Sequence, residues 1–253
     1  MKYIAFDSST KAMTVALAQG NMESPEPLSI VASTTTLGKR QHGQTLAPAI
    51  DTILKQVDWT MAEIDAVIVG VGPGSYTGLR IGVTFAKVWA HSKGLPVYTV
   101  SSLALIAQAG SEASDFIIPI MDARRGTAYV GLYRYEEGQL VALQADQHAQ
   151  FDTWLARLKT TIGVGSAVTL VGSAIEEFVE KAHRQLNGVK IEVVDDFDAY
   201  PLAAAAFNIA PKTLVDDDDV LAPNYAHETL AEREWQEKTQ EVQPEAKDLI
   251  DYK

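Results

Sequence analysis

The chain has 253 residues, of which 47% are hydrophobic and 21% charged, a composition typical of a soluble globular protein. It contains no cysteine, which excludes a disulfide framework and a thiolate metal site. No apolar run reaches the roughly 18 residues of a membrane-spanning helix, and Asp7 interrupts the first apolar stretch, which is unlike a secretory signal. We therefore expect a cytoplasmic protein without membrane contact. The net charge of −12 argues against strong direct binding of nucleic acid.

The first half of the chain alternates apolar strand patterns with helical ones. A turn at Asp7–Thr10 separates the first two strands, and Ser101 is placed to cap the last helix of this half. We place Pro48 in the first turn of its helix, where a missing N–H costs little. In chain order, the expected elements are strands at 3–6, 13–17 and 28–36, a helix at 42–57, a strand at 66–69, a helix at about 79–92, a strand at 96–100 and a helix through 101–106.

A second set of elements follows. The expected elements are strands at 116–121, 128–135 and 168–172, and helices starting at 151 and covering 174–186 and 199–209. The two rounds predict a mixed α/β protein with two similar lobes, residues 1–108 and 109–222, followed by a charged tail at 223–253. We interpret the four consecutive carboxylates of Asp216–Asp219 as a solvated loop, because adjacent acids without other ligands rarely form a metal site.

The most informative segment is the glycine loop, residues 70–82, between an apolar strand and an apolar helix. Its glycines predict a tight backbone path, with at least one of Gly72, Gly74 and Gly78 at positive φ. A P-loop requires Lys and then Ser or Thr after its last glycine, whereas Leu79-Arg80 follows Gly78. The G-x-G-x-x-G spacing of a dinucleotide-binding loop also fails. The segment therefore matches neither of these two phosphate-binding loops.

The run Gly72-Pro73-Gly74-Ser75-Tyr76-Thr77-Gly78-Leu79-Arg80-Ile81-Gly82 resembles the signature of the TsaB family of tRNA threonylcarbamoyladenosine biosynthesis proteins. Other segments also resemble that family: Asp7-Ser8-Ser9-Thr10, Ser101-Ser102-Leu103, Met121–Gly126 followed by Tyr129, and Pro223-Asn224-Tyr225. The chain departs from the family pattern after Tyr225, where Ala226-His227 replaces the common Leu-Arg. The resemblance covers residues 1–135 well and the remainder loosely.

This resemblance implies duplicated ribonuclease-H-like lobes, as in the acetate-kinase, sugar-kinase, Hsp70 and actin superfamily. It also implies a non-catalytic scaffold that pairs with the catalytic subunit TsaD and the ATPase TsaE, or with itself when alone. Together these proteins transfer a threonylcarbamoyl group to adenosine 37 of tRNAs that read codons beginning with A. Since the chain is acidic, we expect tRNA contact to be indirect. For cofactors, we expect none held tightly, with ATP or ADP and Mg²⁺ at the junction with a partner as the one candidate.

Asp7, Ser9 and Thr10 lie where the superfamily's kinases bind nucleotide phosphate and magnesium, and form a weak candidate site. The alternative is a structural turn in which Asp7 accepts backbone hydrogen bonds. Asp122 occupies the corresponding place in the second lobe, but Ala123-Arg124-Arg125 follows it, and we expect these long side chains to fill the phosphate position. We predict no metal site, because no two of the five histidines are spaced like the metal-binding pair of TsaD, and no catalytic residue. The glycine-loop candidates are Gly72, Gly74, Ser75, Thr77 and Gly78.

The helix after the glycine loop is apolar over roughly 220° of its circumference, more than the ~100° that one sheet requires. One interpretation is that this helix and the helix at 42–57 pack only against their own sheet and the other lobe. The other, favoured by the resemblance, is that their outer faces form a four-helix interface with a partner. The expected interface residues are Leu46, Ile50, Ile53, Leu79, Val83 and Ala86.

Two rival functions stay open. One is a weak nucleotide-dependent transferase or hydrolase that uses Asp7 and Asp122. The other is a peptidase, because the family has been grouped with glycoproteases. The peptidase is the weaker rival, since Ser75 lies outside a Gly-x-Ser-x-Gly elbow and the chain has no cysteine nucleophile.

Overall fold

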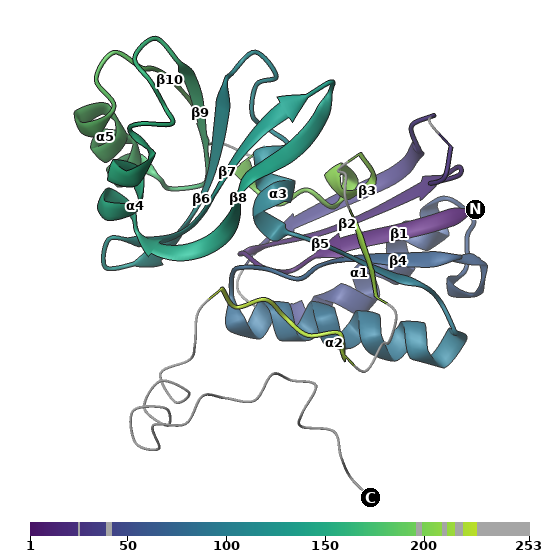
Figure 1. The fold of residues 1–253 in the computed structure, drawn as a ribbon. Coiled ribbons are helices and arrows are strands. Elements are labelled where there is room, and N and C mark those ends of the chain that lie inside the picture. Colours follow the sequence, from purple (N-terminus) through teal and green to yellow (C-terminus); the bar gives the residue numbers. More distant parts are fainter. Residues whose placement is uncertain (25, 39–41, 196–198, 209–211, 216–219, 227–253) are drawn as a thin grey trace, which may run out of the picture.

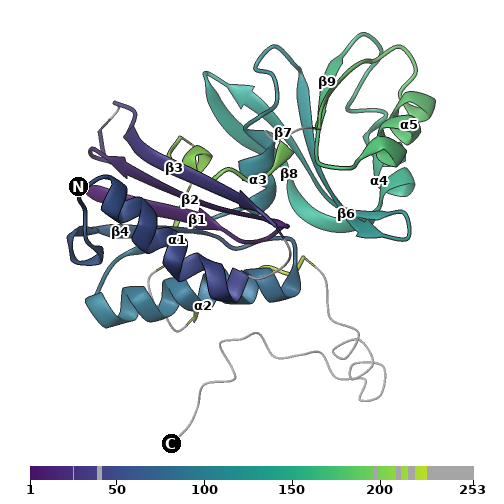
Figure 2. The same ribbon diagram turned by 180° about the vertical axis from the view of Figure 1, so that it is seen from behind.

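A computed structural model describes residues 1–24, 26–38, 42–195, 199–208, 212–215 and 220–226. The described chain forms two α/β lobes, each built on one mixed sheet (Figure 1). Figure 2 shows the same arrangement from behind, with two long helices under the first sheet and two short helices on the far side of the second.

The first sheet has the strand order β11-β5-β4-β1-β2-β3. Its strands are β1 (Lys2–Asp7), β2 (Ala12–Gln19), β3 (Ser29–Leu37), β4 (Ala66–Gly70), β5 (Val97–Val100) and β11 (Thr213–Val215). The strand β1 pairs antiparallel with β2 and parallel with β4, and all of its residues after Lys2 are buried. Such a continuous buried run is expected of a strand that is covered on both faces.

The second sheet has the strand order β10-β9-β6-β7-β8. Its strands are β6 (Phe116–Arg124), β7 (Thr127–Glu136), β8 (Gln139–Gln150), β9 (Ala167–Val171) and β10 (Lys190–Val194). In the order of their appearance along the chain, the first five strands of each lobe therefore adopt the same arrangement, 3-2-1-4-5. This repeated topology confirms the predicted duplication of ribonuclease-H-like lobes.

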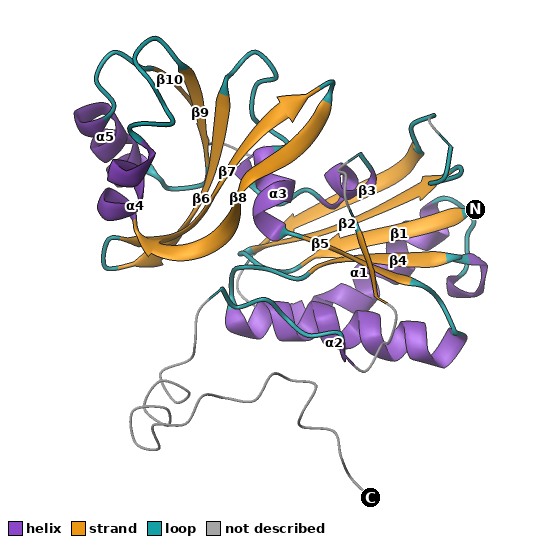
Figure 3. Cartoon of the chain, in the orientation of Figure 1, coloured by secondary structure: helices purple, strands orange, loops and turns teal. Residues whose placement is uncertain are grey.

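Helices cover both faces of the first sheet and the outer face of the second (Figure 3). They are α1 (His42–Gln56), α2 (Tyr76–Lys93), α3 (Ser102–Ala107), α4 (Phe151–Leu158) and α5 (Glu176–Gln185), with 3-10 helices η1 (Met61–Glu63) and η3 (Ala203–Phe207). One apolar core lies between the first sheet and α1 and α2, and another between the second sheet and α4 and α5. A third core joins both sheets through α3 and η3, and it fixes the lobes against each other.

The chain returns to the first lobe near its C-terminal end. β11 pairs antiparallel with β5, η3 packs against β1, β2 and β3, and Leu221 enters the core beneath α2. The division at residue 108 separates the two sheets, but the segment that follows β10 contributes to both lobes. Of the predicted charged tail at 223–253, the structure describes residues 223–226, whereas residues 227–253 and the acidic run Asp216–Asp219 lie outside the described residues.

Several local expectations required correction. The helix expected at 199–209 is the five-residue η3, because Pro201 precedes it and the hydroxyl of Thr14 binds both the Pro201 carbonyl and the Ala203 N–H. Strands β8, β10 and β11 were not predicted. Pro48 lies in the second turn of α1 rather than in the first, so the backbone bond that its N–H would make to residue 44 is missing.

Candidate functional site

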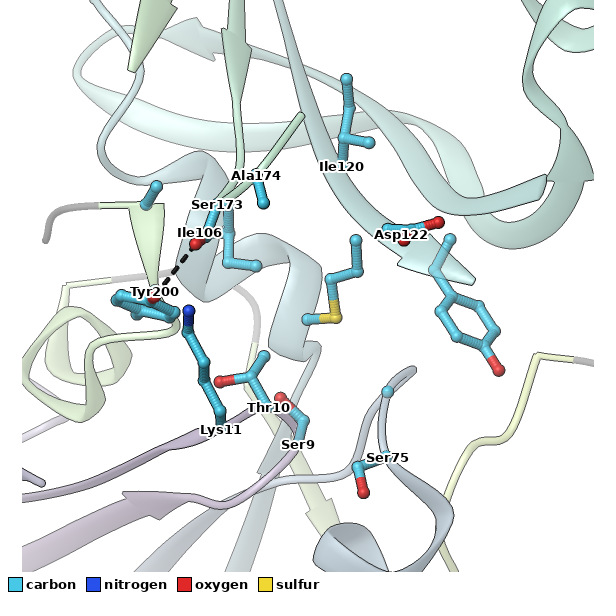
Figure 4. Close-up of a pocket in the computed structure, with 14 residues that line it drawn as sticks. Ser9, Thr10, Lys11, Ser75, Ile106, Ile120, Asp122, Ser173, Ala174 and Tyr200 are labelled. Atoms are coloured by element: carbon cyan, nitrogen blue, oxygen red, sulfur yellow. Dashed lines mark hydrogen bonds between the residues drawn. The ribbon is translucent and has the colours of Figure 1, made fainter. Parts of the chain in front are cut away.

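A cavity of about 340 Å³ lies between the lobes, at the ends of β1 and β6 (Figure 4). Its first-lobe wall is formed by the turn after β1, the glycine loop and α3, and its second-lobe wall by β6, β7 and the turn after β9. The lining residues are Ser9, Thr10, Lys11, Gly74, Ser75, Ile106, Ile120, Met121, Asp122, Tyr129, Ser173, Ala174, Ala199 and Tyr200.

Asp7 is fully buried beneath this cavity and does not line it. Its Oδ1 accepts hydrogen bonds from the backbone N–H of Ser9 at 2.8 Å and from the Ser9 hydroxyl at 2.7 Å. Its Oδ2 accepts one from the Ser102 hydroxyl at 2.6 Å. Both carboxylate oxygens are therefore engaged by the protein, as in the structural-turn alternative. Of the proposed nucleotide residues, Ser9 and Thr10 do reach the cavity wall.

Asp122 lies near the end of β6 in the second lobe, and one of its carboxylate oxygens makes the same kind of turn hydrogen bond as Asp7. Its Oδ1 accepts a hydrogen bond from the N–H of Arg124 at 2.7 Å, two residues ahead, as Asp7 does from Ser9. Arg124 and Arg125 have φ values of 74° and 53°, and both side chains are exposed. They do not line the cavity, so the expectation that they fill the phosphate position is wrong. The hairpin turns these side chains toward solvent.

The glycine loop is shaped by close contacts with the turn after β1 and with residues 221–226, which we call the C-terminal strap. Gly72 and Gly74 have φ values of +110° and +156°, which confirms the expected positive φ. A Cβ atom on Gly74 would lie 2.5 Å from the Ser9 carbonyl oxygen, and one on Gly78 would overlap the carbonyl oxygen of Ser8. The loop is therefore a packing junction, and it positions the N-terminus of α2.

The polar residues of the loop have separate roles. Ser75 caps α2 by accepting a hydrogen bond from the N–H of Gly78 at 3.3 Å, while its own N–H donates to the Ser9 carbonyl at 2.6 Å. Thr77 is exposed and lines a groove between α1 and α2 instead of the cavity. In the strap, the Asn224 N–H donates to Val71 at 2.7 Å, and the Tyr225 ring stacks on Tyr76 with centroids 4.8 Å apart.

A partly buried polar cluster, which no sequence pattern predicted, lies where α3 meets the second sheet. Asp146 on β8 accepts hydrogen bonds from the hydroxyls of Ser101 and Tyr133. Burial raises the pKa of the Asp146 carboxyl, and these hydrogen bonds only partly oppose the rise. Burial and the neighbouring carboxylate likewise raise the pKa of the Tyr133 phenol. The cluster links the lobes, and the N-cap role predicted for Ser101 is confirmed by its bond from Ala104.

A second unpredicted cluster lies at one end of the cavity. Lys11, Ser173 and Tyr200 come from the turn after β1, the turn after β9 and the segment before η3. The Ser173 and Tyr200 hydroxyls are 2.9 Å apart, and the Lys11 ammonium lies 5.4 Å from the centre of the Tyr200 ring. No local sequence pattern could have shown this meeting, because the three residues are separated by more than 25 positions each.

The six expected interface residues belong to the protein's own core. All six are at most 3% exposed. Five of them, Leu46, Ile50, Ile53, Val83 and Ala86, belong to the core between the first sheet and the helices α1 and α2. This corrects the choice of residues, because the sheet uses the sides of α1 and α2 on which they lie. Of the six, Leu46 also lines the groove on the outer sides of the two helices.

These outer sides form a groove of about 610 Å³ between α1 and α2. Its exposed apolar residues include Val88, at 63% exposure, and Tyr76, at 49%. The Arg80 guanidinium lies 5.3 Å from the centre of the Tyr76 ring, at the edge of the groove. The lining residues are Gly43, Leu46, Ala47, Tyr76, Thr77, Arg80, Ile81, Thr84, Phe85 and Val88.

Two features are absent from the described residues. Within those ranges, no group of three or more His, Asp or Glu side chains is arranged to hold a metal ion. Across the same ranges, no helix combines the length and apolar character that crossing a membrane requires.

The fold and the cavity define a two-lobed α/β protein with duplicated sheets. A solved structure titled YeaZ from Pseudomonas aeruginosa matches it with a TM-score of 0.68 and 22% identity, over 88% of this chain and 99% of that one, and so shares its fold. The family model described as TsaD, tRNA N6-adenosine threonylcarbamoyltransferase, matches residues 29–249.

The tRNA threonylcarbamoyladenosine biosynthesis protein TsaB of Bacillus subtilis is 37% identical over 159 residues, which are 63% of this chain and 66% of that relative. The TsaB protein of Escherichia coli is 32% identical over 139 residues, 54% of this chain and 57% of that relative. The matches thus span somewhat less than two thirds of these relatives' lengths. The chain belongs to the TsaD-like family, within its TsaB group.

Proposed function

We propose that this protein acts in the formation of threonylcarbamoyladenosine at position 37 of tRNAs that read codons beginning with A. In this proposal it is a non-catalytic subunit that pairs with TsaD and acts with TsaE. Membership of the TsaD-like family and the names of its TsaB relatives support the pathway.

The observation that carries the pairing is the groove between α1 and α2. Val88, Tyr76 and the partly exposed Ile81 and Phe85 place apolar surface on two adjacent helices. A helix pair from another chain can fill such a groove and bury these side chains, as amphipathic helices do in hydrophobic grooves. The same face would pair two copies of this chain about a two-fold axis when the partner is absent.

The net charge of the chain bears on whether it contacts the tRNA directly. The chain carries a net charge of −12, and phosphate groups bind where Lys and Arg gather. The partner subunit therefore holds the tRNA, and this chain contacts it indirectly. For ATP or ADP with Mg²⁺, the proposed place is the junction with the partner, because the Asp7 oxygens already accept three hydrogen bonds within this chain.

The test is complex formation measured by size-exclusion chromatography with purified TsaD from the same organism. In the Val88→Glu variant, a carboxylate in the contact would be desolvated at a cost of several kcal/mol. A micromolar complex is worth about 8 kcal/mol, so this loss would remove most of it. Val164→Glu is the matched control, because Val164 is 86% exposed and lies on the second lobe, away from the groove.

We expect Val88→Glu to fold, as judged by circular dichroism, and to elute separately from TsaD, while Val164→Glu still forms the complex. If both variants bind TsaD as the parent does, the groove is not the interface. A further assay addresses catalysis: the purified chain alone is expected neither to hydrolyse ATP nor to modify tRNA. ATP hydrolysis by the purified chain alone would establish the nucleotide-dependent enzyme instead.

A further inference from the structure

One end of the interlobe cavity is a positively charged, hydroxyl-lined pocket. Figure 4 shows Lys11, Ser173 and Tyr200 gathered there, with Thr10 beside them. Among the described residues, Lys11 interacts with Tyr200, whose hydroxyl is also hydrogen-bonded to Ser173. Tyr200 is only 8% exposed, whereas Lys11 is exposed. The ammonium group therefore lies at the mouth of the cavity beside two hydroxyl groups, of which one donates to the other and the second can donate to a ligand.

The titration of Tyr200 reports on this local charge. Burial by itself would raise the pKa of the phenol. The hydrogen bonds with Lys11 and Ser173, and the positive charge of Lys11, outweigh burial and hold that pKa below its ordinary value. An environment that favours a phenolate also favours another oxyanion at the same place.

The remainder of the cavity differs in character. Ile106, Ile120 and Met121 supply its apolar surface, and in Figure 4 Ile120 and Asp122 lie across the cavity from the Lys11 cluster. Asp122 is exposed, and its carboxylate would repel a second negative group at that end. The cavity thus has one end suited to an anion and a body suited to hydrocarbon.

We propose that this cavity binds a small amphiphilic anion, whose carboxylate or phosphate group contacts Lys11, Ser173 and Tyr200. The apolar body of the ligand packs on Ile106, Ile120 and Met121. A volume of about 340 Å³ lies near the lower limit of small-molecule sites. The ligand contacts both lobes, because Lys11 belongs to the first lobe and Ser173, Ile120 and Met121 to the second. This inference does not depend on the pairing with TsaD.

The test is binding of defined probes to the purified full-length chain. Binding is measured by isothermal titration calorimetry and by NMR of the amide groups around the cavity. Hexanoate and hexyl phosphate combine a charged group with an alkyl chain, and they distinguish a carboxylate from a phosphate ligand. Hexanol lacks the charge, and inorganic phosphate lacks the alkyl chain. We expect one or both of the alkyl anions to bind at least tenfold more tightly than hexanol and inorganic phosphate.

The variant is Lys11→Met, which keeps the length of the side chain and removes its charge. The matched control is Lys93→Met, because Lys93 is an exposed lysine at the C-terminal end of α2, whereas the glycine loop that lines the cavity precedes the N-terminal end of this 18-residue helix. We expect about tenfold weaker alkyl-anion binding in Lys11→Met, from the loss of a charge-assisted hydrogen bond, and unchanged binding in Lys93→Met.

A second variant, Tyr200→Phe, removes one hydroxyl and retains the ring. We expect weaker binding of the anion and no perturbation of amides outside the cavity. The proposal is overturned if neither alkyl anion binds, if hexanol binds as tightly as hexanoate, or if Lys11→Met and the parent bind equally. Circular dichroism of each variant confirms that a lost signal reflects the site and not the fold.

Discussion

The hydroxyl of Ser102 donates a 2.6 Å hydrogen bond to the Oδ2 atom of Asp7, and this bond ties the turn after β1 to the first residue of α3. The same hydroxyl accepts a hydrogen bond from the N–H of Gly72 at 3.1 Å, so it also holds the glycine loop. Three segments that are remote in sequence therefore meet at one buried carboxylate. The carboxylate fixes the floor of the interlobe cavity and has no free oxygen facing it.

Asp7→Ala is expected to destabilise the fold by roughly 2–4 kcal/mol, because it leaves the Ser9 N–H and two hydroxyls without their buried acceptor. Urea denaturation followed by circular dichroism measures the change. Asp122→Ala serves as the control, since Asp122 is exposed and accepts a hydrogen bond from a turn N–H, and it is expected to cost less than about 1 kcal/mol. Equal effects of the two substitutions would contradict the structural role of Asp7.

Gly78→Ala tests the close packing of the glycine loop. In an exposed helix this substitution stabilises by about 1 kcal/mol, but here the new methyl group would overlap the Ser8 carbonyl oxygen. We therefore expect a loss of roughly 1–3 kcal/mol, measured by thermal and urea unfolding.

Gly74→Val is also expected to destabilise, by roughly 1–3 kcal/mol through strain at φ +156° and contact with Ser9. Gly94 provides the comparison, since it has φ +64° and open space around its missing Cβ. The loss of stability in Gly94→Ala should thus reflect backbone strain without any steric overlap. The reading of the loop as a packing junction fails if Gly78→Ala is as stable as the parent.

Asp146→Asn tests the buried carboxyl between the lobes. Because the folded-state pKa of Asp146 is raised by burial, the folded protein binds this proton more tightly than the unfolded chain does. The associated stability is present in full below the ordinary value of 3.8 and is lost as the pH rises through the higher folded-state pKa. The parent should therefore lose stability relative to Asp146→Asn over this rise in pH. Melting temperatures of both proteins between pH 4 and 7.5 measure the difference, and parallel curves would contradict it.

Ile53→Glu is expected to unfold the protein, because Ile53 is 1% exposed and packs in the core beneath α1. An unpaired carboxylate there costs several kcal/mol, a large part of the stability of a domain. Val88→Glu, on the outer side of α2, should instead leave the fold intact. Circular dichroism and the elution volume of the two variants decide the matter. A folded Ile53→Glu would mean that this side of α1 is accessible.

The sequence by itself determined the class of fold and most of its elements, because the local spacing of apolar residues distinguishes strands from helices. The buried run at β4 and the apolar stretch of α2 were both predicted in place, and so was the need for positive φ in the glycine loop. The edge strand β10, which is mostly exposed, and the short β11 have weaker patterns, because fewer of their side chains enter a core.

Only the tertiary structure decided which apolar residues face inward. Ile53 and Val88 are both β-branched hydrophobic residues on predicted helices, yet the first is buried and the second is 63% exposed. The apolar arc is wider than one sheet requires. The packing of α1 and α2 on the sheet therefore decides which of its residues are buried. The tertiary structure also decided that Lys11, Ser173 and Tyr200 meet. The sequence around each of them shows no sign of a binding site, and the order of the strands brings them to one cavity. Local sequence specifies elements through propensity and period, whereas contacts between distant turns depend on how the two sheets are placed against their shared core.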